Sequence, residues 1–138
     1  MSNDENPLII RIDATNDLVV VELAGDLDME TTPALTAELK AVLGARPVVV
    51  ELSGVEFMDS SGIGVLLGAH REAAAEGGAL LLVAASPRLQ KIFKITHLHK
   101  VFALHETMES AVASLESPLE IEGAPVETVV PGFTTEPD

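Results

Sequence analysis

Residues 48–68, VVVELSGVEFMDSSGIGVLLG, decide the fold of this chain. The stretch opens with an apolar run rich in β-branched valine, which is typical of a buried β-strand. It closes with Ile63, Leu66 and Leu67, which lie at helical spacing. The segment 58–62 (MDSSG) between them therefore places two hydroxyl groups and a carboxylate at the N-terminus of a helix.

Upstream of this stretch, residues 8–13 and 18–24 predict two strands that form a hairpin. Residues 25–28 (GDLD) are expected to break the second strand. Thr32 followed by Pro33 predicts a helix start, with a hydroxyl cap and a proline at the first helical position. Gly44 is expected to end this helix.

Downstream, the helix that starts near Ser60 is expected to run to about Glu76, where two glycines stop it. The apolar run 79–85 is typical of a strand that is covered on both faces. Ser86 and Thr107 predict the caps of two more helices, with a loop at 96–100 and a short strand at 101–104 between them.

The expected element order is β-β-α-β-α-β-α-β-α. Because strands and helices alternate after the hairpin, the later strands should run parallel with right-handed crossovers, and the helices should cover one or both faces. The predicted fold class is a single α/β domain with a mixed sheet.

Composition limits the classes of function. The net charge of −14 and the absence of Trp and Tyr argue against nucleic-acid binding, and the charge also disfavours anionic membranes. The absence of cysteine excludes disulfides, thiol catalysis and zinc–thiolate sites. No apolar run has the length of a membrane span and the first six residues are polar, so we expect a cytoplasmic protein.

We expect three regions: a flexible N-terminus (1–7), a folded domain (8–115) and an acidic, proline-rich disordered tail (116–138). The tail contains four of the eight prolines and six acidic residues but no Lys or Arg. The first 115 residues carry 16 acidic and 8 basic side chains, a net charge of −8.

Ser60 is the candidate acceptor of a regulatory phosphate. Free amides and the helix dipole favour an anion at a helix N-terminus. A phosphate there adds roughly −1.5 to −2 charges beside Asp59, which would repel a partner that presents carboxylates or apolar surface. The alternative is that Ser60 and Ser61 only cap the helix, which is worth about 1 kcal/mol.

Gly62 and Gly64 each lower helix stability by about 1 kcal/mol relative to alanine. They serve either close packing of the helix on the sheet or the approach of another surface to the backbone. The residues alone leave both readings open.

Catalysis by Ser60 has little support in the sequence. The surrounding residues do not form the G-x-S-x-G elbow of serine hydrolases, and no histidine has a sequence context that places it as the general base. The pair His97 and His99 has the spacing of a metal site only if it lies on a strand, and its segment reads as a loop.

Asp26 and Asp28 form a second acidic pair, which could bind a divalent cation, lie near phosphates or serve a turn. If the two strands involved are parallel, this pair lies at the same end of the sheet as Ser60.

Three stretches together resemble the anti-sigma factor antagonists of bacteria, the STAS-domain family. They are 23–28 (LAGDLD) with 32–35 (TPAL), 55–66 (VEFMDSSGIGVL) and 90–96 (QKIFKIT). They occur in the order and spacing of the family, and the similarity covers about residues 8–115. The resemblance implies a small α/β domain with a mixed sheet and about four helices largely on one side.

In this family, the first hydroxyl after the motif aspartate is phosphorylated by a partner that is both an anti-sigma factor and a serine kinase. That position is Ser60 here. The resemblance implies that the unphosphorylated protein binds the kinase and frees a sigma factor, that phosphorylation ends the complex, and that a phosphatase resets it. Asp28 matches a family aspartate on the surface that faces the kinase and its nucleotide. The expected partner-binding residues are Asp28, Asp59, Ser61, Gly62 and Gly64.

The chain departs from the family in two places. His97 stands where many members have glycine, so a different loop backbone is expected, and the tail has no counterpart in the minimal domain. We expect a phosphorylation-controlled binding protein of transcription regulation, without catalysis, cofactor, metal, nucleic acid or membrane. The alternatives are a scaffold or sensor subunit of a larger STAS assembly, and a serine-dependent enzyme.

Overall fold

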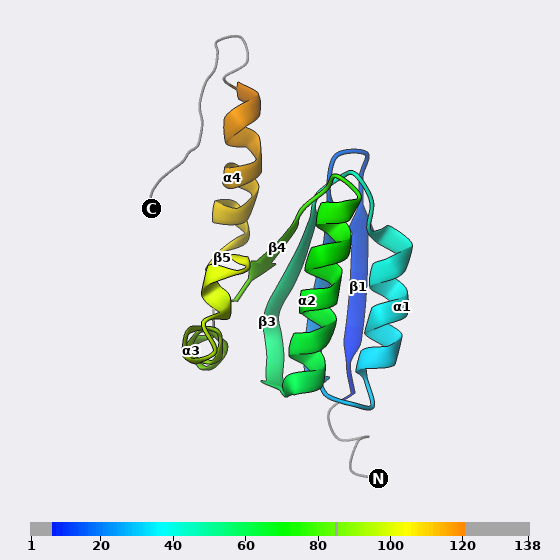
Figure 1. Cartoon of the computed structure of the whole chain (residues 1–138), viewed down its shortest axis with the longest axis vertical. Coiled ribbons are helices and arrows are strands. Elements are labelled where there is room, and N and C mark those ends of the chain that lie inside the picture. The colour runs from blue at the N-terminus through cyan, green and yellow to red at the C-terminus, as the bar shows by residue number, and fades with distance from the viewer. Residues whose placement is uncertain (1–6, 85, 121–138) are drawn as a thin grey trace.

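The computed structural model describes residues 7–84 and 86–120, with side chains described to residue 115. Figure 1 shows the chain. The elements, in order, are β1 (Ile9–Ala14), β2 (Val19–Leu27), α1 (Thr32–Val42), β3 (Val48–Met58), α2 (Ser60–Ala75), β4 (Leu80–Val83), α3 (Pro87–Ile95), the 3-10 helix η2 (Leu98–Lys100), β5 (Ala103–His105) and α4 (Met108–Glu120).

The five strands form one sheet in the order β1-β2-β3-β4-β5. β1 pairs antiparallel with β2, and each later strand pairs parallel with the one before it. This confirms the predicted mixed sheet. The physical reason is that a four-residue turn can only reverse the chain, whereas each later pair of strands is separated by a helix that carries the chain back.

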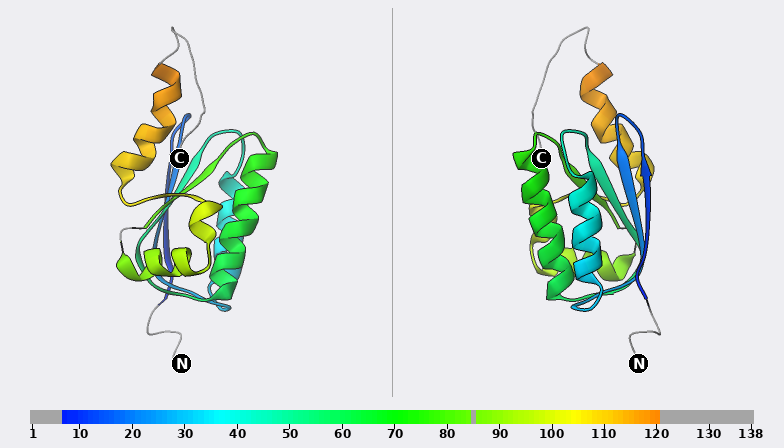
Figure 2. Two further views of the ribbon diagram at one scale, coloured as in Figure 1. Left: turned by 60° about the vertical axis from the view of Figure 1, so that its left-hand side comes forward. Right: turned by 90° about the vertical axis from the view of Figure 1, so that its right-hand side faces the viewer.

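The sheet has two apolar faces because alternate residues of a strand point to opposite sides. On β3, Val48, Val50 and Leu52 belong to the larger core cluster, to which α1, α2 and α3 contribute. Val49 belongs to a smaller cluster that includes Ala111 of α4. Figure 2 shows α1 and α2 on one side of the sheet and α4 on the other. The helices therefore lie largely on one side, as the family resemblance implied, with α4 as the exception.

β2 is longer than the sequence predicted. The segment 25–28 was expected to break the strand, yet pairing with β3 continues to Leu27. The pairing shifts register near Gly25, which has φ = 116°. A side chain at Gly25 would overlap the carbonyl of Pro7. The glycine therefore makes a bulge inside the strand rather than an end to it.

Of the three helix caps predicted at Thr32, Ser86 and Thr107, the structure has two. The Ser86 hydroxyl accepts a hydrogen bond from the Leu89 amide, and the Thr107 hydroxyl accepts one from the Ser110 amide, which confirms both caps. The predicted cap at Thr32 is wrong. Thr32 is already the first helical residue, and the preceding Thr31 donates its hydroxyl to the Asp26 carbonyl instead.

The segment after α3 also differs from expectation. The predicted loop at 96–100 contains the short helix η2, and the strand predicted at 101–104 lies at Ala103–His105. His97 has φ = 62°, in the left-handed region that glycine favours. His97 therefore adopts a backbone conformation that glycine takes more readily. The amide of His97 still donates to the Lys94 carbonyl at 3.1 Å.

Replacing His97 with glycine is expected to raise the free energy of unfolding by about 0.5–1 kcal/mol. Glycine removes the clash of Cβ in a left-handed conformation, and the larger entropy of unfolded glycine offsets part of that gain. Urea denaturation measures the change. Lys100→Gly, in η2 where no positive φ is needed, should lower stability; a loss of stability in His97→Gly would contradict the argument.

The predicted tail boundary falls inside α4, which continues past residue 115 to Glu120. Residues 1–6 and 121–138, on which most of the flexible-terminus and disordered-tail predictions rest, lie outside the described residues. Within the part of the chain that the structure describes, no helix is long and apolar enough to cross a membrane.

Candidate functional site

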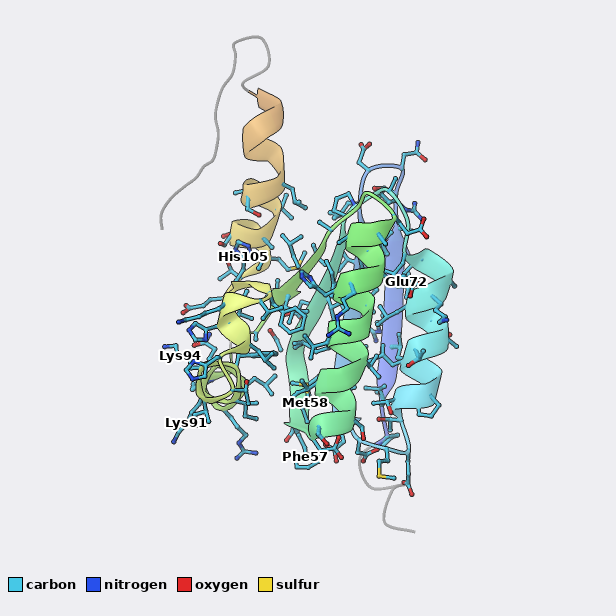
Figure 3. All side chains as sticks on the ribbon, viewed as in Figure 1. Phe57, Met58, Glu72, Lys91, Lys94 and His105 are labelled. Atoms are coloured by element: carbon cyan, nitrogen blue, oxygen red, sulfur yellow. The ribbon has the colours of Figure 1, made fainter. Side chains whose placement is uncertain are left out.

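The carboxyl ends of β2 and β3 lie side by side, as the parallel arrangement predicted. Leu27 and Met58 are paired in the sheet, and the Asp59 amide donates to the Leu27 carbonyl at 3.1 Å. The segment that carries Asp28 and the N-terminus of α2 therefore meet at one end of the sheet. Figure 3 shows this end with Phe57 and Met58 labelled.

We call this region the Ser60 edge and define it by Asp28, Met29, Phe57, Asp59 and Ser60.

Asp59 is the N-cap of α2. Its Oδ1 accepts hydrogen bonds from the Ser61 amide at 2.8 Å and the Gly62 amide at 3.3 Å. The alternative that Ser60 and Ser61 cap the helix is therefore wrong, because a neighbouring carboxylate satisfies the free amides. Ser60 is the first residue of α2 and is exposed to solvent. Its hydroxyl is accessible to another protein.

The same cap corrects the electrostatic argument for a phosphate. The sequence predicted free backbone donors for it, but those of Ser61 and Gly62 already bind Asp59. A phosphate on Ser60 would instead stand beside the carboxylate of Asp59. The amides at the N-terminus of α2 would then neutralise less of the phosphate's negative charge than the sequence predicted. More of that charge would face a partner.

The two glycines of the motif have different roles. A Cβ on Gly62 would lie 2.8 Å from both Leu27 Cβ and Met58 Cγ, so this glycine lets α2 begin directly on the ends of β2 and β3. A Cβ on Gly64 would meet nothing within 4 Å, and the residue is exposed. Close packing on the sheet therefore explains Gly62, whereas no packing contact among the described residues requires glycine at position 64.

Asp28 organises the loop before α1. Its Oδ1 accepts hydrogen bonds from the amides of Glu30 at 3.0 Å and Thr31 at 3.1 Å. This is the turn chemistry that was one of the alternatives for the acidic pair. The side chain of Asp28 is half-buried, so it also fixes the shape of the backbone that lies opposite Asp59.

Sequence reasoning missed two apolar side chains at the Ser60 edge. Met29 is 74% exposed and Phe57 is 50% exposed. Both are flanked by acidic residues, Glu30 and Glu56, which are exposed as well. The available signal was that Phe57, one of only four phenylalanines, lies directly beside the polar segment 58–62. Apolar side chains in such positions are typical of a protein-binding surface.

A groove of about 370 Å³ runs between α1 and α2 and begins at Ser61. Gly64 and Gly68 form part of its α2 side, and Thr36 and Lys40 form part of its α1 side. The groove therefore continues from the Ser60 edge along the exposed glycines of α2.

The histidines do not support catalysis by Ser60. His70 lies ten residues further along α2, which corresponds to about 15 Å of helix rise, and its ring packs against Phe102 at 5.4 Å. His105 Nδ1 lies 2.7 Å from the Ser110 hydroxyl, and partial burial lowers the pKa of this histidine. In residues 7–84 and 86–115, whose side chains the structure describes, no group of three or more His, Cys, Asp or Glu side chains is placed to hold a metal ion.

Comparisons with known proteins agree on one family. Residues 9–111 match the STAS domain family. The anti-sigma F factor antagonist of Lysinibacillus sphaericus is 34% identical over 87 residues, which cover 61% of this chain and 74% of the relative. The crystal structure of an anti-sigma factor antagonist from Mycobacterium paratuberculosis has a TM-score of 0.73 and 28% identity, covering 80% of this chain and 95% of that one.

The anti-sigma factor antagonist SpoIIAA is similar in both of its solved forms. Its unphosphorylated form has a TM-score of 0.67 and 28% identity, covering 79% of this chain and 97% of that one. The phosphorylated form of SpoIIAA, described as a Bacillus cell fate determinant, has a TM-score of 0.60 and 29% identity, covering 78% and 99%. Because the family match spans nearly all of the described sheet and helices, this chain belongs to the STAS domain family.

Proposed function

We propose that this chain is an anti-sigma factor antagonist of the cytoplasm. It binds an anti-sigma factor that is also a serine kinase, and phosphorylation of Ser60 ends that complex until a phosphatase removes the phosphate. The observation that carries the proposal is that Asp59 caps α2 and leaves the Ser60 hydroxyl exposed at the first helical position. An exposed hydroxyl on a fixed helix end is accessible to the active site of a kinase.

The relatives support the proposal. Curated relatives carry the name anti-sigma factor antagonist, and one solved relative of that name, SpoIIAA, exists in an unphosphorylated and a phosphorylated form. A relative that is 28–29% identical to this chain and has the same fold therefore exists with and without a phosphate, which supports a phosphorylation switch here.

The chemistry of the Ser60 edge supports an electrostatic release. Before modification, Met29 and Phe57 offer apolar surface that a partner can bury. After modification, roughly −1.5 to −2 charges stand beside Asp59. Burying that charge next to a carboxylate and apolar side chains costs desolvation energy without a compensating partner. The complex is then disfavoured.

The proposed partner-binding residues divide into two groups. Asp28 and Asp59 hold the two backbone segments of the Ser60 edge, and Gly62 sets the distance between α2 and the sheet. Ser61 and Gly64 border the groove between α1 and α2, where a partner can approach the helix backbone.

Incubation with the cognate anti-sigma factor and ATP is expected to add one phosphate to the protein, and Ser60→Ala should abolish the addition completely. Intact-mass spectrometry followed by peptide mapping reads the result. Ser53→Ala is the control and should still be labelled, because it removes an exposed hydroxyl of β3 that lies outside the proposed partner-binding residues. Labelling that persists in Ser60→Ala, or turnover by the purified chain alone, would contradict the proposal.

A further inference from the structure

Half of the positive charge of this acidic chain lies in one stretch that has no acidic residue. Residues 77–105 contain no Asp or Glu, and all 22 acidic residues lie outside this stretch. The stretch holds four of the eight basic residues. Its elements α3 and η2 are therefore a positive region on a protein whose other residues carry a net negative charge.

The outward side of α3 carries this charge. Arg88, Lys91 and Ile95 recur at helical spacing and lie on one side of the helix, while Phe93 is fully buried on the other. Figure 3 shows Lys91 and Lys94 extending away from the sheet.

Apolar side chains are exposed in the same region. Ile95 is 65% exposed and Val101 is 45% exposed, and each follows a lysine in the chain. We define the α3 basic face by the exposed residues Arg88, Lys91, Lys94, Ile95, Lys100 and Val101. Such a surface fits an acidic segment that also carries apolar residues.

We propose that the C-terminal segment of this same chain, residues 121–138, docks on the α3 basic face. The segment contains four acidic residues and no Lys or Arg, and Val129, Val130 and Phe133 supply apolar surface to match Ile95 and Val101. Outside residues 77–105, the first 115 residues carry 16 acidic and four basic side chains and repel the segment on balance, so the α3 basic face is the surface that attracts it most strongly.

The length of the segment permits this contact. α4 begins three residues after the end of β5, and its 13 residues rise by about 20 Å. The 18 residues that follow can span up to about 60 Å when extended, which is enough to return along α4 to α3. Attachment to the same chain also gives the segment an effective concentration on the order of millimolar.

The α3 basic face borders the Ser60 edge. Arg88 Nη1 donates to the Glu56 carbonyl at 3.4 Å, next to Phe57 at the end of β3. A docked segment would therefore place negative charge beside the surface that we propose for the partner. The contact itself does not depend on the proposed function, and the experiment below measures the contact alone.

Paramagnetic relaxation tests the contact in the full-length chain. Because the chain contains no cysteine, Thr134→Cys gives a single attachment point for a nitroxide label. We expect the amide signals of Lys91, Lys94 and Ile95 to lose intensity at least about threefold more than those of Arg11 on β1, because a docked segment holds the label beside α3. About 0.5 M NaCl should weaken the effect by screening.

Two charge variants give matched controls. Lys91→Glu with Lys94→Glu should remove the broadening, whereas Lys40→Glu with Arg71→Glu, which changes the net charge equally at exposed sites elsewhere, should keep it.

A variant with a neutral segment, E122Q/E127Q/E136Q/D138N, should also remove the broadening at α3. Three outcomes would overturn the proposal. One is broadening that is no stronger at α3 than at β1. Another is broadening at α3 that persists in the variant with the neutral segment. The third is broadening of isotope-labelled chains by separate nitroxide-labelled chains, which would show that a second copy is the occupant.

Discussion

Gly62→Ala is expected to lower the free energy of unfolding by about 1–3 kcal/mol, the cost typical of overpacking a filled core. The added Cβ would lie 2.8 Å from Leu27 Cβ and from Met58 Cγ, and 3.2 Å from the Leu27 carbonyl oxygen. Leu27 and Met58 are both buried, so neither can move away freely. Relief requires α2 to shift from the ends of β2 and β3, and that shift would displace Ser60.

The matched control is Gly64→Ala, two residues along the same helix. A Cβ there meets nothing within 4 Å, so the substitution should change the free energy of unfolding only through helix propensity. Alanine should raise the free energy of unfolding by up to about 1 kcal/mol. Urea denaturation of both variants, with the m-values compared, measures the two effects. A shift of the same sign in both variants would show that tight packing at Gly62 is not the cause.

Ser60→Asp is expected to weaken binding to the anti-sigma factor by roughly tenfold or more, equivalent to about 1.4 kcal/mol. The variant places one permanent negative charge beside Asp59, at an exposed position bordered by apolar side chains. Ser60→Asn has nearly the same shape without the charge, and it should bind close to the unmodified protein. Titration calorimetry on all three proteins measures the difference.

The charge argument also predicts a salt dependence. The difference in affinity for the anti-sigma factor between Ser60→Asp and Ser60→Asn should become smaller as ionic strength rises, because salt screens the repulsion between exposed charges. Equal affinities of the two variants would mean that shape rather than charge controls the complex. Phosphorylated protein, which carries more charge than aspartate, should bind more weakly than Ser60→Asp.

Local patterns in the sequence were sufficient for much of the fold. The valine run of β3 and the spacing of Ile63, Leu66 and Leu67 predict a strand and a helix, and both are observed. The alternation of strands and helices then predicts the parallel pairs, because a crossover helix leaves few other arrangements. The Ser86 and Thr107 caps were predicted in the same way, since a cap is a contact between residues three apart.

Other features depend on contacts between distant segments, which local patterns do not encode. Gly25 reads as a strand end, but β3 pairs with β2 beyond it and makes the glycine a bulge. His97 takes a glycine-type backbone because the fold on either side holds the turn in place.

The candidate site shows the same division. The sequence by itself determined that Asp59 and Ser60 stand at the start of a helix, and that this end of the sheet also carries Asp28. Only the tertiary structure decided which glycine packs and which stays open, and that Met29 and Phe57 are exposed beside Ser60. The physical reason is that burial and close approach are set by what the rest of the chain places against a residue, whereas periodicity and capping are set within one turn of backbone.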